Sequence, residues 1–348
     1  MKEQIAIQNK IEVVGIDLAK NNFQICCADA RGKILKEHLV RRKDLLAIMA
    51  QLPPSLVAME ACGGAHYWAR QCQKLQHKVL LIPPQYIKPF VRTNKNDRAD
   101  AAAIVTAALQ PNMPFVPVKQ ESQQEIMTIH RLRSILVKHR TSLINNIRGL
   151  LAEFGMVFPQ GFASVRRGLA DILSPTNESL PNSLKTAFSE IFHELLQLDQ
   201  RITIYDTQLH ANVRTSESCR RLMTIPGIGV MTSTALVGTI GDWKRFSNGR
   251  ALSAYLGLVP RQHSSGGSHR LLGISKRGDK YLRSLIVHGA RSVLWYSKRK
   301  SDRFSQWACA CKEKRGFNRA CVAVANKLAR RCWAIMAHNT KYQEAFIS

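Results

Sequence analysis

The first 118 residues alternate between short apolar runs and amphipathic segments in a fixed order, which restricts the fold of this part of the chain to few possibilities. Three apolar, β-branched runs joined by short turns predict an antiparallel meander of strands at 11–18, 23–28 and 34–40. Helix, strand, helix, strand and helix are then predicted in turn at 42–51, 55–59, 65–75, 78–82 and 97–109. The order βββ-α-β-α-β-α is that of an RNase H-like α/β domain, in which the first and fourth strands are central neighbours.

Four acidic residues fall at the ends of these predicted elements. Asp17 ends the first strand, Glu60 ends the fourth, and the last helix begins with Asp97 and Asp100. A spacing of three residues puts the two helix aspartates on one face, and strand ends project into the crevice where α/β sheets bind ligands. Because converging carboxylates repel one another unless a cation joins them, we predict a site for two divalent ions, Mg²⁺ or Mn²⁺. The alternative is that Asp97 and Asp100 cap a helix and its first turn, that Asp17 is an aspartate of a turn, and that Glu60 is a solvated residue at the sheet edge.

Residues 119–217 are predicted to form a helical spacer, with long helices at 122–154 and 181–214. Apolar residues of the second helix step by four and three over four heptads, which is typical of a coiled coil. This seam could pair with the first helix or with another subunit, and we expect the subunit contact. The first helix carries six basic residues that form either a solvated face or a nucleic-acid track: His130, Arg131, Arg133, Lys138, Arg140 and Arg148.

Residues 218–348 are predicted to form a mainly α-helical domain that begins with a helix–hairpin–helix motif. Two short helices within 222–241 are joined by Pro-Gly-Ile-Gly, where Gly227 and Gly229 would let the backbone approach a phosphate. Such a motif contacts the backbone of DNA and not its bases. A plain helix turn capped by glycines is the alternative.

A long loop is predicted at 257–276, after a short helix at 250–256 that Ser247 caps. Ser264 and Ser265 stand directly before two glycines in this loop, and Arg and His side chains flank them. Those side chains could hold a phosphate and stabilise its developing charge, although a Ser/Gly-rich segment alone is more often an ordinary loop. A basic helix follows at 278–295 and a final helix at 318–337. The candidate nucleic-acid ligands are Gly227, Gly229, Arg261, His269, Arg270, Lys276, Arg277 and Arg283.

The formal charge of +27 favours a polyanionic partner, and nucleic acid is the first candidate. Residues 241–348 hold 22 basic and 5 acidic residues, so this part is expected to be the main contact with phosphate. The nine cysteines form no CxxC pair, which argues against a structural zinc site and for a reducing compartment. We find no signal peptide or membrane span, and we expect a cytoplasmic, nucleoid-associated protein.

Motifs over nearly the whole chain resemble the IS110 family of insertion-sequence transposases, and most closely its IS1111 branch. They are GIDLAK at 15–20, MEACGGAHYWAR at 59–70, PPQYIKPFVRTNKNDRADAAAI at 83–104, HRLRSILVKHRTSLINNIRGLLAEFG at 130–155, PGIG at 226–229, GLVPRQHSSGG from 257 and GISKRGDKYLR ending at 283.

The resemblance implies a RuvC-like N-terminal domain with a DEDD metal set, a coiled-coil segment and a serine-bearing transposase domain, at 1–118, 119–217 and 218–348. Carried over by position, the DEDD set falls on Asp17, Glu60, Asp97 and Asp100, and the serine is Ser265. The family also implies a structured non-coding guide RNA, encoded by the element, that pairs with donor and target DNA.

We therefore expect an RNA-guided DNA recombinase that excises and inserts its own element through attack of Ser265 on a phosphodiester. Strand exchange needs two cleaved duplexes held together, so we expect a homo-oligomer, a dimer or a tetramer. One alternative is a metal-dependent, Holliday-junction-type endonuclease in which the serine loop only binds. Another is a non-catalytic architectural protein, against which the four carboxylates argue.

Overall fold

The structure is a computed structural model that describes residues 10–91, 97–265 and 268–343, without the side chains of 265, 268 and 269. The chain divides into two compact units, Met1–Gln120 and Glu121–Ser348, which are described separately below. The first boundary lies two residues beyond the position predicted from the sequence, and a division of the second unit at 217 stays a prediction. No helix in the described part of the chain is long and apolar enough to span a membrane.

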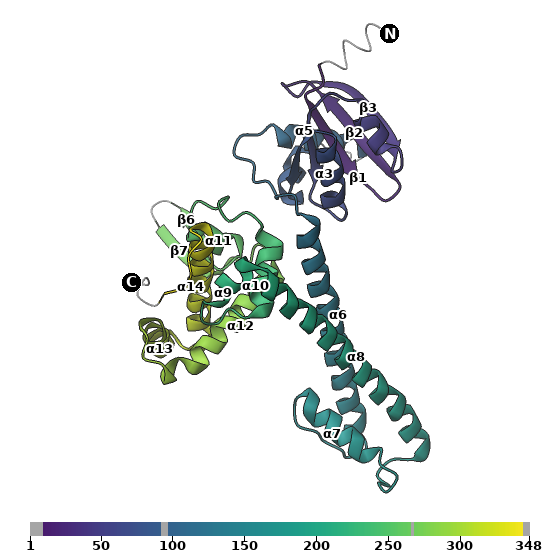
Figure 1. The fold of residues 1–348 in the computed structure, drawn as a ribbon, viewed down its shortest axis with the longest axis vertical. Coiled ribbons are helices and arrows are strands. Elements are labelled where there is room, and N and C mark those ends of the chain that lie inside the picture. Colours follow the sequence, from purple (N-terminus) through teal and green to yellow (C-terminus); the bar gives the residue numbers. More distant parts are fainter. Residues whose placement is uncertain (1–9, 92–96, 266–267, 344–348) are drawn as a thin grey trace. The chain divides into compact units, whose positions relative to one another are not determined.

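The first unit is built on a five-stranded mixed sheet in the order β3-β2-β1-β4-β5 (purple to blue in Figure 1). Its strands are β1 Val13–Leu18, β2 Asn22–Ala28, β3 Ile34–Arg41, β4 Leu56–Glu60 and β5 Lys78–Ile82. The first three pair antiparallel, whereas β1–β4 and β4–β5 pair parallel. The first and fourth strands are therefore central neighbours, consistent with the predicted RNase H-like domain.

Helices cover both faces of this sheet because the strand residues alternate between two cores. On one face Phe23 and Trp68 meet edge to face at 5.2 Å, and Trp68 belongs to α3. On the other face Val13 and Cys26 pack against Ala101 and Val105 of α5. The helical segments of this unit are α2 Leu45–Met49, α3 Ala65–Lys74, α4 Pro84–Ile87, η1 Lys88–Phe90 and α5 Asp97–Ala108.

The second unit begins with a helical hairpin of α6 Glu121–Ala152 and α8 Asn182–Thr215, with the short α7 Phe162–Ile172 packed against both. The apolar seam of α8 is covered by the same chain. Leu198 and Ile202 pack with Leu136 of α6, and Phe188 and Leu195 join a core with α6 and α7. The expectation that a second subunit covers this seam is thus wrong, because α6 already fills the role.

Most of the basic residues of α6 are engaged within the protein, which corrects the interpretation of this helix as a nucleic-acid track. His130 is fully buried and lies 2.9 Å from both the Tyr281 hydroxyl and the Thr234 hydroxyl. Arg133 forms a bidentate ion pair with Asp206 of α8. Arg140 pairs with Asp199, and Arg148 donates to the Phe158 carbonyl. Only Arg131 and Lys138 are exposed among the six.

The rest of the second unit is a helical bundle around one apolar core. Its helices are α9 Glu217–Met223, α10 Val230–Ile240, α11 Gly249–Tyr255, α12 Lys280–Tyr296, η2 Ser297–Arg299, α13 Arg303–Arg315 and α14 Phe317–Ala337. The sequence patterns did not indicate α13. The cap of α11 is Asn248 and not Ser247, because the Asn248 side chain accepts the Ala251 amide at 3.0 Å.

The Pro-Gly-Ile-Gly turn joins α9 and α10 as predicted, but one of its glycines has a packing role. Gly227 has φ +87°, and a Cβ atom there would lie 2.8 Å from the Gly289 carbonyl oxygen of α12. Conversely, a Cβ atom on Gly289 would lie 2.0 Å from the Gly227 oxygen. The two glycines therefore allow this turn to lie directly on α12. Gly229, at the N-terminus of α10, is exposed.

Candidate active site

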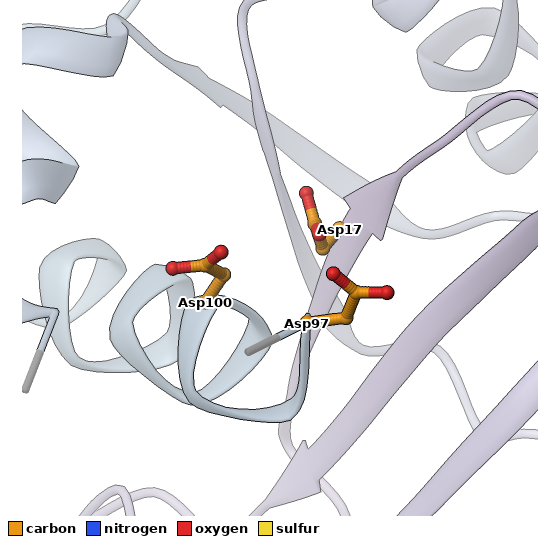
Figure 2. A group of neighbouring side chains, drawn as sticks. All are labelled: Asp17, Asp97 and Asp100. Atoms are coloured by element: carbon orange, nitrogen blue, oxygen red, sulfur yellow. The ribbon is translucent and has the colours of Figure 1, made fainter. Parts of the chain in front are cut away.

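Three aspartates from two elements converge beside the first strand of the first unit. Asp17 is the fifth residue of β1, and α5 begins with Asp97 and carries Asp100 one turn later. Each offers a carboxylate oxygen, and these oxygens all lie within 4.8 Å of one another. Figure 2 shows the strand end and the first turn of the helix turning the three carboxylates toward a shared space. The predicted convergence of Asp17, Asp97 and Asp100 is present.

Glu60 lies near this cluster without being one of the three. It ends β4, and the residue before it, Met59, pairs with Ile16 of β1, so Glu60 stands beside Asp17 in the parallel register. Its charge contributes to the raised pKa of Asp17, after burial and the charges of Asp100 and Asp97. The structure thus brings Glu60 to the edge of the site predicted for four carboxylates.

Close packing of α5 on β1 sets the geometry of the cluster. Gly15 sits in the middle of β1, and a Cβ atom there would come within 2.6 Å of the Ala101 carbonyl oxygen. The helix can approach the strand only because residue 15 has no side chain and because residue 101 is a small one. Gly15 was missed as a functional position, although a glycine inside a β-branched strand is a known signal of close backbone approach.

The cluster carries uncompensated negative charge. Burial, together with the charges of Asp100, Asp97 and Glu60, raises the pKa of Asp17 to about 6, against one backbone hydrogen bond that lowers it. Arg98, which lies between Asp97 and Asp100 in the sequence, pairs with Glu37 of β3. Among the described residues no ion pair involves the four carboxylates.

A divalent cation fits this donor set. Carboxylate oxygens are the ligands that Mg²⁺ and Mn²⁺ prefer, and a cation would replace the repulsion that raises the pKa of Asp17 with attraction. Asp17, Asp97 and Asp100 are placed to hold such an ion, with Glu60 beside Asp17.

The serine segment of the second unit differs from the predicted long loop. Residues 257–276 contain an antiparallel hairpin of β6 Pro260–Ser265 and β7 Ser268–Ile274. Ser265 is the last residue of β6 and is paired in register with Ser268. The two glycines of the predicted motif, at 266–267, lie outside the described residues, as do the side chains of Ser265 and His269. Ser264 accepts a hydrogen bond from Gln262 at 2.7 Å.

The predicted nucleic-acid ligands occupy two kinds of position. Arg261, Arg270, Lys276 and Arg277 are exposed on and beside the hairpin. Arg283 in α12 is half-buried and donates to the Leu256 and Arg277 carbonyls at 3.1 and 3.3 Å. Part of its hydrogen-bonding capacity therefore holds the end of α11 to the start of α12.

Two family models match the chain. One, described as Transposase IS116/IS110/IS902 family, matches residues 219–306, and a DEDD-type model of the IS110 group, described as Transposase, matches residues 14–156. The transposase for insertion sequence element IS1111A of Coxiella burnetii is 43% identical over 333 residues, which are 96% of this chain and 92% of that protein. The chain belongs to the IS110 family of transposases.

Further relatives of this IS110-family transposase match over similar lengths. A probable family 20 transposase of Pseudomonas aeruginosa is 43% identical over 331 residues, 95% of this chain and 98% of the relative. The transposase for insertion sequence element IS1328 of Yersinia enterocolitica is 39% identical over 334 residues, 96% and 99% of the two chains. Membership of the family makes the protein an enzyme that cleaves and recombines DNA. The DEDD-type match includes all four carboxylates, and the other match includes Ser265.

Proposed function

We propose that this transposase excises and inserts its own element through a covalent serine–DNA intermediate, with Asp17, Glu60, Asp97, Asp100 and Ser265 as its catalytic residues. The observation that carries the proposal is the group of three aspartates, whose oxygens lie within 4.8 Å of one another in a protein with a charge of +27. Packing alone gives no reason to assemble like charges there, whereas phosphodiester chemistry does.

The carboxylates would hold one or two divalent ions, and we propose Mg²⁺ or Mn²⁺. When bound, such an ion neutralises phosphate charge and lowers the pKa of a coordinated hydroxyl. The residues of the chain supply the geometry. Asp97 and Asp100 share one helix face, Asp17 approaches from the strand, and the absent side chain of Gly15 keeps the two elements in contact.

The serine step is a transesterification. The Oγ atom of Ser265 attacks the phosphorus, an Oγ–P bond forms, and the bond from phosphorus to the departing sugar oxygen breaks. The serine proton passes to water, and the sugar oxygen becomes a hydroxyl that stays as the nucleophile for resealing. Ser265 follows Asp100 by 165 residues and belongs to the other unit, so the proposal requires the units to meet within one chain or across subunits.

Basic side chains would position the nucleic acids around this chemistry. We assign phosphate contacts to Arg261, His269, Arg270, Lys276, Arg277 and Arg283, and to the turn at Gly227 and Gly229 as a helix–hairpin–helix element. The exposure of Arg261, Arg270, Lys276 and Arg277, and of Gly229 at a helix N-terminus, supports this assignment. The partners are donor and target DNA and a guide RNA encoded by the element, in the bacterial cytoplasm at the nucleoid.

Strand exchange requires an assembly, and we propose a homodimer or homotetramer. The α6–α8 hairpin supports this proposal, because apolar side chains remain on its outer surface after the coiled-coil-like seam is buried. Ile135 is 60% exposed on α6 and Ile204 is 54% exposed on α8. Exposed apolar side chains on long helices are typical of a surface that a partner covers.

A hydrolytic, junction-type endonuclease is the second candidate, because the carboxylate cluster is complete within a unit that lacks Ser265. The test is Ser265→Ala with purified protein, guide RNA and labelled DNA. Loss of a denaturation-resistant protein–DNA adduct with intact DNA binding supports the serine mechanism. Cleavage that persists without an adduct in both proteins supports the endonuclease. Ser264→Ala is the matched control and is expected to keep the adduct.

A further inference from the structure

A large basic groove in the second unit lies apart from every residue assigned above. It has a volume of about 1560 Å³ and is bounded by α11, α13, α14, the segment after α14 and the base of the β6–β7 hairpin. Six cationic side chains surround Arg331 along it, namely Arg250, Arg315, Arg319, Lys327, Arg330 and Lys341. Among the lining residues that the structure describes, none is acidic.

Arg331 is the unusual member of this lining. The residue is only 6% exposed, and its Nε, Nη1 and Nη2 atoms are buried without a hydrogen-bond partner in the described structure. Its guanidinium carbon lies 3.5 Å from the Phe304 ring centroid and 5.2 Å from that of Tyr342. Stacking of this kind satisfies the faces of the guanidinium and leaves its N–H edges without acceptors. A buried charge with unsatisfied donors destabilises a fold, so such a residue is expected where a ligand supplies the acceptors.

Aromatic side chains make the groove more than an anion site. Trp307, Trp333 and Tyr342 line it together with the cations. The Lys327 ammonium lies 4.2 Å from the Trp307 ring centroid, and burial together with the charges of Arg331 and Arg330 lowers the pKa of that lysine. A groove of this volume is far larger than a phosphate ion needs. Alternating aromatic and cationic side chains in a groove are the pattern by which proteins bind single-stranded nucleic acid.

The groove also has a defined relation to the hairpin. Pro260 and Ile274, which are paired with each other at the base of the hairpin, both line the groove. Ser265 lies five residues further along β6, about 17 Å away at the rise of an extended strand. A strand bound in the groove would therefore be held at a fixed distance from the backbone of the residue proposed as nucleophile.

We propose that this groove binds a single-stranded segment of DNA and that Arg331 donates to the edge of one unstacked base within it. The planar fork of a guanidinium matches the acceptors on a base edge, and guanine offers two of them side by side. The bases would stack on the tryptophans, and the phosphates would meet the exposed cations at the rim. The link between this groove and catalysis rests on the proposed function, whereas the binding itself does not.

The test measures binding of the whole protein to a fluorescein-labelled single-stranded DNA heptamer by anisotropy at fixed salt. An abasic heptamer with the same phosphates is the second probe. We expect the wild-type protein to prefer the normal heptamer by about 10-fold or more. Arg331→Met is expected to reduce this preference by at least half while melting at the same temperature as the wild type or above it, because stacking on the tryptophans remains. Arg303→Met removes an exposed arginine of α13 that does not line the groove, and should keep the preference.

Arg331→Lys keeps the charge without the planar fork and covers the case in which Arg331→Met does not fold. It is expected to bind the abasic heptamer as the wild type does and to show a reduced preference for bases. Equal binding of both heptamers by the wild type would overturn the proposal in favour of a general polyanion or acidic-peptide surface. A preference that is undiminished in Arg331→Met and in Arg331→Lys would also overturn it. Ser265→Ala should leave the preference unchanged, so failure of the serine mechanism is distinguishable from failure of this inference.

Discussion

Gly15 of β1 and Ala101 of α5 are in such close contact that any side chain at residue 15 would collide with the helix backbone. A Cβ atom on Gly15 would lie 2.6 Å from the Ala101 oxygen and 2.7 Å from the Val105 Cγ2 atom. This contact lies between Asp17, two residues along the strand, and Asp100, the residue before Ala101. Asp17 on the strand can therefore lie close to Asp97 and Asp100 on the helix only because residue 15 has no Cβ atom.

Gly15→Ala should weaken divalent-cation binding without removing a carboxylate. The added methyl group forces α5 away from β1 and separates Asp97 and Asp100 from Asp17. Loss of support behind metal ligands typically lowers affinity by about 10- to 100-fold. Titration with Mn²⁺ measures the effect. Gly149→Ala, at a helix position with no atom within 4 Å of the new Cβ, is the control and should bind as the wild type does. Equal affinities in the two variants would contradict the role of Gly15.

Asp17→Asn should stabilise the cation-free protein at pH 7.5. The pKa of Asp17 in the folded protein is about 6 and lies above its ordinary value, so its contribution favours folding below about pH 4 and is lost as the pH rises through about 6. Removing the charge should raise the free energy of unfolding of the first unit by on the order of 1–2 kcal/mol, after allowance for solvent screening. Scanning calorimetry with and without Mg²⁺ measures this. Mg²⁺ should raise the melting temperature of the wild type and not of the variant. Two results would contradict this prediction: an Asp17→Asn protein that melts at a lower temperature than the wild type in EDTA, or one whose melting temperature rises with Mg²⁺ as much as that of the wild type.

His130 should make the stability of the second unit sensitive to acid. Burial, with a smaller contribution from the Arg133 charge, lowers the pKa of His130 to about 4, against the opposing effect of Asp206. The folded state favours the neutral imidazole. The contribution of His130 to the free energy of unfolding is therefore complete above about pH 6.5 and is lost as the pH falls toward about 4. This contribution has an upper limit of about 3 kcal/mol. Urea unfolding of the wild type and of His130→Gln at pH 7 and pH 4.5 measures it. The difference in free energy of unfolding between the two proteins should be smaller at pH 4.5 than at pH 7. An equal difference at both pH values would be inconsistent with a buried neutral histidine.

Arg133 and Lys138 should respond differently to the same substitution. Arg133→Met leaves Asp206 without its bidentate partner and should lower stability by about 1–2 kcal/mol. Lys138 is exposed, and Lys138→Met should change stability by less than about 0.5 kcal/mol. The two variants lose equal charge, so their DNA affinities should be alike. The opposite outcome is that Arg133→Met melts as the wild type does and binds DNA less tightly than Lys138→Met. That outcome would support the interpretation of α6 as a nucleic-acid track.

The sequence predicts the first unit well because its elements are short, apolar and separated by strong turn signals. The strand predicted at 78–82 is β5 Lys78–Ile82, and the helix predicted from Asp97 is α5. The convergence of three carboxylates follows from that order of elements. The order of elements does not reveal the close contact between α5 and Gly15 that brings the carboxylates together, because the role of Gly15 depends on which helix packs against it.

Prediction is weaker in the second unit for identifiable reasons. Strand β6 is polar after Pro260, and the apolar residues Leu271 and Leu272 of β7 are adjacent, so neither strand shows an alternation of apolar residues to detect. Polar and charged residues are generally expected at the surface, yet His130 and Arg331 are buried by helices distant in sequence. The proposed base-binding groove depends on such a residue and could not be inferred from the motif positions.

We propose that the carboxylates of the first unit and the serine of the second form one active site. The most direct test of this proposal is the yield of the covalent protein–DNA adduct in Asp100→Asn, with Mg²⁺, guide RNA and labelled DNA. We expect the yield of the adduct to fall by about 100-fold or more while DNA binding is unchanged. The reason is that Ser265 remains, but the stabilisation of charge in the transition state of its attack is lost. An adduct that forms at the wild-type rate in Asp100→Asn would contradict the account and separate the carboxylate cluster from the serine chemistry.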